Sequence, residues 1–140
     1  MDVKNVLFIS QEIMPYLPET TMSKSGFDMT QGMQEMGVQV RTFMPKYGLI
    51  NERRNQLHEV IRLSGMNLII DDTDHPLIIK VATLPSRAQV YFIYNDDYFA
   101  HSLTKELETA SSPEDNDERS IFFVRGVIET VRKLRWQPSV

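Results

Sequence analysis

The run VLFI at residues 6–9 and the run VQVRTFM at residues 38–44 decide the fold class of this chain. A short, continuous apolar run is typical of a parallel strand with both faces buried, and an alternating run that stops at a proline predicts a second strand. Residues 27–36, between them, have helical spacing. Strand, helix and strand within about 40 residues predict a βαβ unit, which we expect to have a right-handed crossover.

Residues 10–25, between the first strand and this helix, are expected to form a long loop, because Pro15 and Pro18 exclude a helix there. Asp28 falls in the first helical turn, where negative charge is favourable. Gly37 suits the C-terminal cap.

The middle of the chain predicts a β-meander inserted after the βαβ unit. Four short β-rich runs lie at residues 59–63, 67–70, 77–84 and 89–94. The polar stretch at residues 71–76 separates two of them and is typical of a hairpin turn.

The last third of the chain predicts two helices. Residues 96–108 should begin with a short helix, and residues 110–116 form a polar loop. Residues 117–134 follow the 3-and-4 spacing of an amphipathic helix. The candidates for its N-terminal cap are Asp115, Asn116 and Asp117.

These elements predict an α/β, partial Rossmann-like fold. After the long helix and Pro138, the βαβ rhythm calls for another parallel strand, and the sequence reaches Val140 where we expect that strand to begin. The expected organisation is therefore one domain over residues 1–140, truncated before a further core strand.

Composition narrows the function. The formal net charge is −4 and the pI is near 5.3, so the basic footprint of a nucleic-acid-binding protein is absent. The chain has no cysteine, which excludes disulfides, thiolate nucleophiles and cysteine-based zinc sites. No apolar run approaches the roughly 20 residues that span a bilayer. We expect a cytoplasmic protein with no membrane partner.

The loop after the first strand holds the first candidates for ligand binding. In doubly wound folds, ligands bind beyond the carboxyl ends of the strands. Lys24, Ser25 and Gly26 lie there, and a glycine before a helix allows backbone N–H groups to approach a phosphate. Because the GxGxxG spacing is absent, a simple helix-start glycine is the favoured interpretation.

Other polar groups suggest weaker alternatives. Asp71, Asp72, Asp74 and His75 offer oxygen ligands for a hard cation, although their positions fit a hairpin tip better. The remaining histidines, His58 and His101, have no partner at helical spacing, so metal and triad roles are unsupported.

Four stretches resemble the glycogen and starch synthases. They are residues 4–16 (KNVLFISQEIMPY), residues 36–48 (MGVQVRTFMPKYG), residues 115–119 (DNDER) followed by two phenylalanines, and residues 136–138 (WQP). The stretch from Asn51 through Val81 looks most like a Bacteroidetes-type subgroup of that family.

This resemblance implies a retaining glycosyltransferase of two-domain GT-B architecture. Such enzymes transfer glucose from ADP-glucose or UDP-glucose to an α-1,4-glucan, with the donor held between two Rossmann-like domains and with no metal or other cofactor. The resemblance implies that Lys24 and Gly26 would touch the donor diphosphate. The acceptor-side candidates are Asp96, Asp97, Asn116 and Arg119.

The sequence also departs from the family pattern. The family's Lys-x-Gly-Gly donor loop has its nearest counterpart at residues 24–27, where Phe27 replaces a glycine, while an ungapped alignment puts Thr20 and Thr21 there. The family's histidine loop falls beyond Val140, and its C-terminal domain lies outside the sequence. We therefore expect no catalytic residue set and no transfer by this chain alone.

Two alternatives remain open. The chain could be a non-catalytic interaction or glucan-contact module that self-associates through an open sheet edge. It could also be a different Rossmann-like nucleotide-binding enzyme, although that requires a phosphate loop absent from the sequence.

Overall fold

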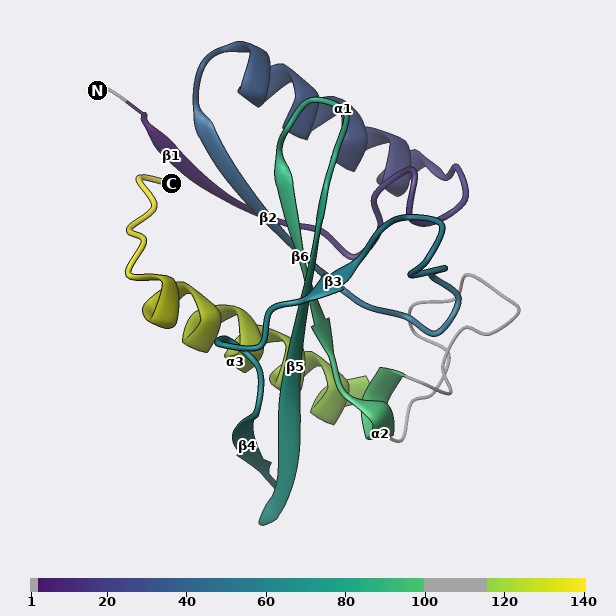
Figure 1. The fold of residues 1–140 in the computed structure, drawn as a ribbon, viewed down its shortest axis with the longest axis vertical. Helices are drawn as coiled ribbons and strands as arrows, with labels where there is room; N and C mark the ends of the chain where they lie inside the picture. Colours follow the sequence, from purple (N-terminus) through teal and green to yellow (C-terminus); the bar gives the residue numbers. More distant parts are fainter. Residues whose placement is uncertain (1–2, 100–115) are drawn as a thin grey trace.

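The computed structural model describes residues 3–99 and 116–140, and these residues form a mixed sheet flanked by helices (Figure 1). The main path of the sheet runs β1-β2-β6-β5-β3, and β4 pairs with β5. In chain order the elements are β1 (Asn5–Ile9), α1 (Thr21–Glu35), β2 (Gln39–Pro45), β3 (His58–Glu59), β4 (Met66–Ile70), β5 (Thr73–Thr83), β6 (Gln89–Tyr94), α2 (Asp96–Phe99) and α3 (Asn116–Leu134).

The predicted βαβ unit is confirmed. β1 pairs with β2 in parallel, with Phe8 opposite Thr42, and α1 connects the two strands. The connection needs a helix because parallel neighbours cannot be joined by a tight turn.

The predicted β-meander is present in part, and it is continuous with the core sheet. The run predicted at residues 59–63 is a strand only at Glu59, and residues 73–76 of the predicted turn belong to β5. β4, β5 and β6 pair in antiparallel fashion, and the turn between β4 and β5 places Asp71 and Asp72 at φ angles of 51° and 62°. β6 then pairs with β2 in parallel, with Phe43 opposite Tyr91. The last strand of the meander is thus the third parallel strand of the Rossmann-like core.

The expectation that β1 is buried on both faces is wrong. Val6, Leu7 and Phe8 are only half-buried, and Ile9 is 50% exposed. β1 lies at the end of the strand order, so only β2 provides a neighbouring strand of the described sheet. The fully buried strand residues lie instead in β2, β4, β5 and β6.

The start of α1 is the main correction to the predicted elements. The helix begins at Thr21 rather than at Phe27, so residues 21–25 are helical and the loop before them is shorter. Thr20 accepts a hydrogen bond from the Ser23 backbone N–H, and Ser23 Oγ accepts one from the Thr20 backbone N–H. This reciprocal cap determines where the helix begins.

Helix α3 packs on the sheet face that carries Leu77 and Ile93, and it approaches closely at Gly126. The segment that leads into α1 packs on the opposite face. There the rings of Tyr16 and Phe92 make a T-shaped contact, with their centroids 4.9 Å apart. In Figure 1, α1 and α3 accordingly lie on opposite sides of the sheet.

The residues that follow α3 lie along the free edge of β1. The Val140 N–H donates to the Asn5 carbonyl at 3.3 Å, and the Leu7 N–H donates to the Val140 carbonyl at 2.8 Å. These two bonds flank Val6 in the pattern of a parallel strand pair. The Trp136 Nε1 donates to Gln39 at 2.8 Å, and the Arg41 guanidinium of β2 lies over the Trp136 ring.

Candidate functional site

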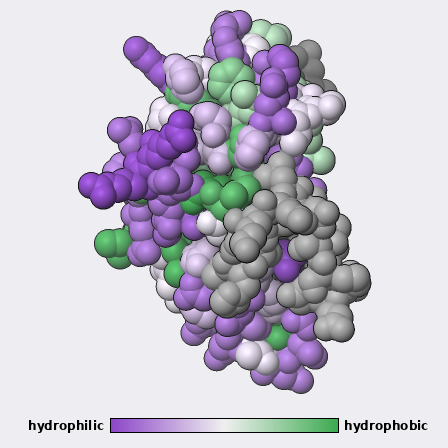
Figure 2. Space-filling model, turned by 90° about the vertical axis from the view of Figure 1, so that its right-hand side faces the viewer, coloured by the Kyte–Doolittle hydropathy of each residue, from purple (hydrophilic) through white to green (hydrophobic). Residues whose placement is uncertain are grey.

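The loops that follow β1, β2 and β6 meet at the carboxyl end of the parallel strands. They comprise residues 10–20, residues 46–57 and the segment that enters α2. Figure 2 views the molecule from the right-hand side of Figure 1, where these loops lie, and shows mostly hydrophilic side chains around a small hydrophobic patch. Ligands of open α/β sheets bind at this edge.

Glu12, Tyr47 and Arg119 converge at this edge from three different segments. Each is buried, with 7%, 2% and 6% exposure. Burial and then the Glu12 carboxylate raise the pKa of Tyr47 far above its ordinary value, and the Arg119 guanidinium acts in the opposite direction. Tyr47 therefore keeps its phenolic proton between an anionic group and a cationic group. Sequence reasoning named Arg119 here and missed Tyr47.

The loop after β1 is held by its own side chains. Ser10 Oγ donates to the Glu12 carbonyl at 2.9 Å, and Thr20 Oγ1 donates to the Glu12 carboxylate at 2.8 Å. The second bond connects the loop directly to the N-terminal cap of α1. Glu12 is thus fixed from both sides at the end of β1.

The donor candidates Lys24, Ser25 and Gly26 do not form a loop, because all three lie in the first two turns of α1. Lys24 is exposed and its ammonium pairs with Asp28 at 3.2 Å. A Cβ at Gly26 would lie 3.0 Å from the Glu12 carbonyl oxygen, so this glycine allows close packing of α1 on the loop after β1. The donor-binding role of the three residues remains a prediction.

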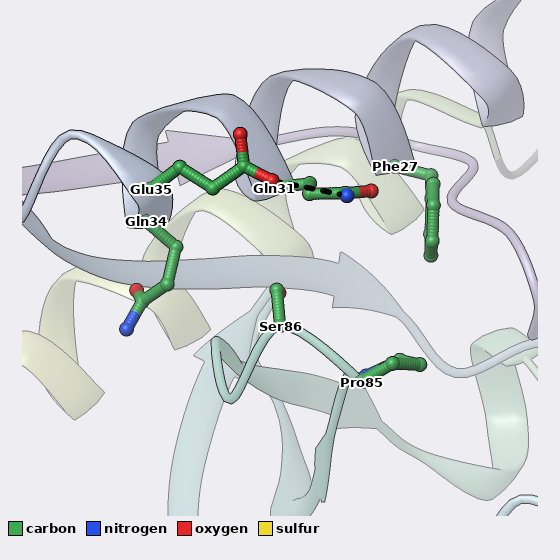
Figure 3. Close-up of a pocket in the computed structure, with 6 residues that line it drawn as sticks. All are labelled: Phe27, Gln31, Gln34, Glu35, Pro85 and Ser86. Carbon is green, nitrogen blue, oxygen red and sulfur yellow. Dashed lines mark hydrogen bonds between the residues drawn. The ribbon is translucent and has the colours of Figure 1, made fainter.

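Phe27, which stands where the family pattern has a glycine, lies away from this edge. Figure 3 shows it in a pocket of about 460 Å³ between α1 and the turn that joins β5 to β6. Pro85 and Ser86 form the opposite wall, and Gln31 uses its amide to bond Glu35 on the same helix. Phe27 consequently does not block the carboxyl ends of the strands.

The acceptor-side candidates separate into two groups. Asp96 accepts a hydrogen bond from the Tyr94 phenol at 2.6 Å and thus faces β6. Burial, followed by this hydrogen bond and the Asp96 charge, raises the pKa of Tyr94 to about 12. Asn95 caps α2, because its Oδ1 accepts the Asp97 backbone N–H at 2.8 Å.

Asp97 and Arg119 are brought close together by α2 and α3. Arg119 Nε donates to the Tyr98 backbone carbonyl at 2.9 Å, and Asp97 directly precedes Tyr98. Asn116 begins α3 at the same end of that helix. The cap candidate Asp115, His101 and residues 110–115 of the predicted loop lie outside the described residues.

A second ionic cluster, missed by sequence reasoning, lies beside the same edge. The Glu52 carboxylate accepts a hydrogen bond from Lys80 and pairs with Lys46 at 3.2 Å. The ammonium groups of Lys46 and Lys80 lie over the Tyr94 ring, 5.0 and 5.4 Å from its centroid respectively. Partial burial alone would raise the pKa of Glu52, but hydrogen bonds from Lys80 and Lys46 hold it below its ordinary value. The only sequence signal was the Pro-Lys-Tyr turn after β2.

The alternative of a metal site gains no support. Within residues 3–99 and 116–140, no group of three histidine, aspartate or glutamate side chains is placed to hold a cation. Asp71 and Asp72 form the hairpin turn, and His75 contacts Asp97. Among the helices of the same residues, none has both the length and the apolarity to cross a bilayer.

Comparison with known proteins now identifies the family. The family model described as the starch synthase catalytic domain matches residues 5–140. The chain belongs to this family. It is 38% identical over 137 residues to a glycogen synthase of Chlorobaculum tepidum and 36% identical to one of Chlorobaculum parvum, in each case covering 96% of this chain and 28% of the relative.

The fold agrees with this membership. The catalytic domain of starch synthase IV from Arabidopsis thaliana, solved with ADP and acarbose bound, superposes with a TM-score of 0.78 at 17% identity. The match covers 99% of this chain and 27% of that chain. The chain thus shares the GT-B type of α/β fold and spans about 28% of the length of the glycogen synthases it matches. The Bacteroidetes-type subgroup stays a prediction.

Proposed function

We propose that this chain serves in glucosyl transfer from ADP-glucose or UDP-glucose to an α-1,4-glucan, as the N-terminal part of a glycogen synthase-like enzyme. The family match along residues 5–140 carries this proposal. Because the chain spans only 28% of the length of its relatives, the proposal includes that it transfers no glucose by itself. A cytoplasmic location is proposed with it, since the absence of cysteine suits a reducing compartment.

The donor diphosphate would meet the chain near the start of α1. Lys24 is the exposed cation in the first turns of that helix, and an exposed ammonium can move toward a phosphate. Gly26 would contribute indirectly, by allowing α1 to approach the loop that holds Glu12. Ser25, which is exposed beside them, remains the third donor candidate.

The glucan acceptor would lie nearer α2 and the start of α3. Asp97 is exposed there, with 66% of its side chain accessible, and carboxylates are suited to binding sugar hydroxyls. Asp96, Asn116 and Arg119 complete the acceptor-side set. The family needs no metal, and no metal or other cofactor is part of the proposal.

A glucosyl-transfer assay tests this function directly. Glycogen would be incubated with ADP-glucose or UDP-glucose and either this chain or a polypeptide in which this chain replaces the matching segment of the Chlorobaculum tepidum glycogen synthase. Transfer by the hybrid but not by the isolated chain is expected. Transfer by neither, with both proteins folded, would indicate that this lineage retained the fold and lost the chemistry.

A second function is favoured by the free edge of β1. An apolar groove of about 260 Å³ lies between β1 and α3, and its lining includes Ile9, Val124 and Ile128, each about half exposed. The residues at 139 and 140 bond to the outer edge of β1 at Asn5 and Leu7, and a strand edge that is paired only in part beside an apolar groove is suited to accepting more strand. We propose that a further parallel core strand fills this groove in a longer polypeptide, and that in its absence the chain self-associates there.

A further inference from the structure

His75 lies at the centre of a hydrogen-bonded chain that joins three elements. Its imidazole is largely buried near the start of β5, with Nδ1 3.2 Å from Asp97 Oδ2 and Nε2 3.0 Å from the Tyr98 phenolic oxygen. The Tyr98 phenol donates in turn to Glu118 Oε2 at 3.2 Å. The contacts therefore link β5 to α2 and α2 to α3.

The number of protons in this chain of contacts is constrained. An ionised carboxylate only accepts, so Asp97 requires an N–H on Nδ1 of His75. Tyr98 has a single O–H, which it donates to Glu118, so its oxygen can only accept from Nε2–H. The three contacts need three protons, and a neutral imidazole with one phenol supplies only two.

We propose that His75 is held as an imidazolium that donates from both ring nitrogens and acts as a proton-dependent positioning residue between β5, α2 and α3. When the ring loses a proton from Nε2, the Tyr98 hydroxyl can satisfy either His75 or Glu118 but not both. One of the two links then opens. The connection between the β4–β5 hairpin and the start of α3 thus weakens as the proton is removed.

The charges around the ring are consistent with a cation at this position. Asp97 comes from α2, Glu118 and Arg119 come from α3, and Asp71 comes from the β4–β5 turn. Burial, the hydrogen bond to Glu118 and the charges of Glu118, Asp97 and Asp71 raise the pKa of Tyr98 to about 12, so Tyr98 keeps its proton. Among these groups the three carboxylates outnumber the single guanidinium of Arg119. A positive charge on the His75 ring would offset part of the excess negative charge.

This inference goes beyond the proposed function and does not depend on it. Asp97, which we place on the acceptor side, contacts the His75 ring directly, and Arg119 donates to the backbone carbonyl of Tyr98, whose phenol meets the same ring. A change in ring protonation would shift these two side chains together.

Nitrogen-15 NMR of the imidazole ring tests the protonation state in the intact chain. At pH about 7, within the range in which histidine charge changes, both ring nitrogens of His75 are expected to carry protons. The variants His58→Gln and His101→Gln assign the signals of the other two histidines of the chain. A His75 ring with one protonated nitrogen and one bare nitrogen at that pH would overturn the proposal.

The pH profile of stability tests the positioning role. The equilibrium constant for unfolding would be measured for wild type, His75→Gln and His58→Gln at pH about 6 and about 8. We expect His75→Gln to raise the equilibrium constant for unfolding relative to wild type. The ratio of the two constants should be about threefold to tenfold larger at the lower pH than at the higher pH, which corresponds to the loss of one hydrogen bond. His58→Gln should show no such difference.

A tyrosine variant keeps this second test decisive. In a Tyr98→Phe background the phenolic oxygen is missing, so the pH-dependent part of the His75→Gln effect should largely disappear, as expected for coupled partners. An equal effect of His75→Gln at both pH values in wild type would overturn the proton-dependent role. If His75→Gln does not fold, the ring nitrogens of wild type still decide the proposal.

Discussion

At the scale of single residues, Gly26 is a glycine whose presence is explained by close packing in the fold. A glycine near the start of the first helix resembles part of a phosphate loop, yet in the structure it lies in the second turn of α1 against the loop after β1. The missing side chain makes room for the Glu12 carbonyl and for Ile13. The residue type follows from packing between two segments.

Replacing Gly26 with alanine should destabilise the protein. Its Cβ would lie 3.0 Å from the Glu12 oxygen and 3.1 Å from Ile13 Cγ1, and overpacking of this kind costs about 1–3 kcal/mol. Gly32→Ala is the matched control, because a Cβ there meets nothing within 4 Å and should stabilise α1 by about 0.5–1 kcal/mol. Denaturant unfolding measures both, and equal effects would contradict this explanation.

Glu52 makes the second residue-scale prediction, because it balances two lysines. Its pKa is lowered in the fold, so the stability it contributes is present above the ordinary value of about 4.5 and is lost as the pH falls through the folded value. Glu52→Gln should cost about 1 kcal/mol at pH 7, a modest figure because 38% of the side chain is exposed. The cost should shrink toward pH 3.

Urea unfolding at several pH values measures this dependence. Glu59→Gln is the control, since Glu59 is exposed on the two-residue strand β3. A cost for Glu52→Gln that stays constant from pH 7 to about 3 would show that the two lysines do not act on its ionisation.

At the scale of elements, the start of α1 decides how the loop after β1 is held. Thr20 caps the helix and its hydroxyl also reaches the Glu12 carboxylate, so one side chain joins two segments. The prolines in the loop predicted a later start. The prolines do disfavour helix where they stand, but Thr20 follows them and supplies the cap at which α1 begins.

Thr20→Ala should therefore lower stability by more than the loss of a cap alone. A cap costs about 1 kcal/mol, and the lost hydrogen bond to the charged Glu12 adds a comparable amount, giving about 2 kcal/mol. Thr20→Ser keeps both oxygen contacts and should stay within about 0.5 kcal/mol of wild type. Thermal unfolding followed by circular dichroism compares them. A serine variant as unstable as the alanine variant would indicate that the methyl group matters instead.

At the scale of the whole molecule, the end of the sheet at β1 exposes more apolar surface than the strands at its centre. β1 lies at the end of the strand order, its outer edge is bonded by residues 139 and 140 only at Asn5 and Leu7, and an apolar groove separates it from α3. Exposed apolar surface beside unpaired strand atoms is a site of association. The groove therefore governs how the chain behaves in solution as well as what it can pair with.

Sedimentation velocity over a range of concentrations measures that association. Wild type is expected to show a concentration-dependent dimer, and Val124→Lys, which places a charge in the groove, should remain a monomer. Ser120→Lys adds the same charge to the same helix at an exposed position outside the groove lining and should dimerise like wild type. A wild-type monomer at every concentration would contradict self-association.

The sequence by itself determined the local elements and the family. β1, β2, the hairpin turn at Asp71 and Asp72, and α3 each follow from a periodicity or turn preference contained within a few residues. The stretches at residues 4–16 and 36–48 carried the family resemblance for the same reason, because a motif is contiguous. The prediction that was wrong by most residues is the start of α1. That start depends on the Thr20 cap, whose effect competes with that of Pro15 and Pro18.

Only the tertiary structure decided which distant residues share an environment. The parallel pairing of β6 with β2 turned the end of the meander into a core strand, and it brought Tyr47, Lys80 and Arg119 to one edge. The link from His75 to Glu118 likewise joins residues from separate elements. Strand order and packing depend on which apolar surfaces bury one another across the whole chain, and that long-range choice leaves no mark in the local spacing of residues.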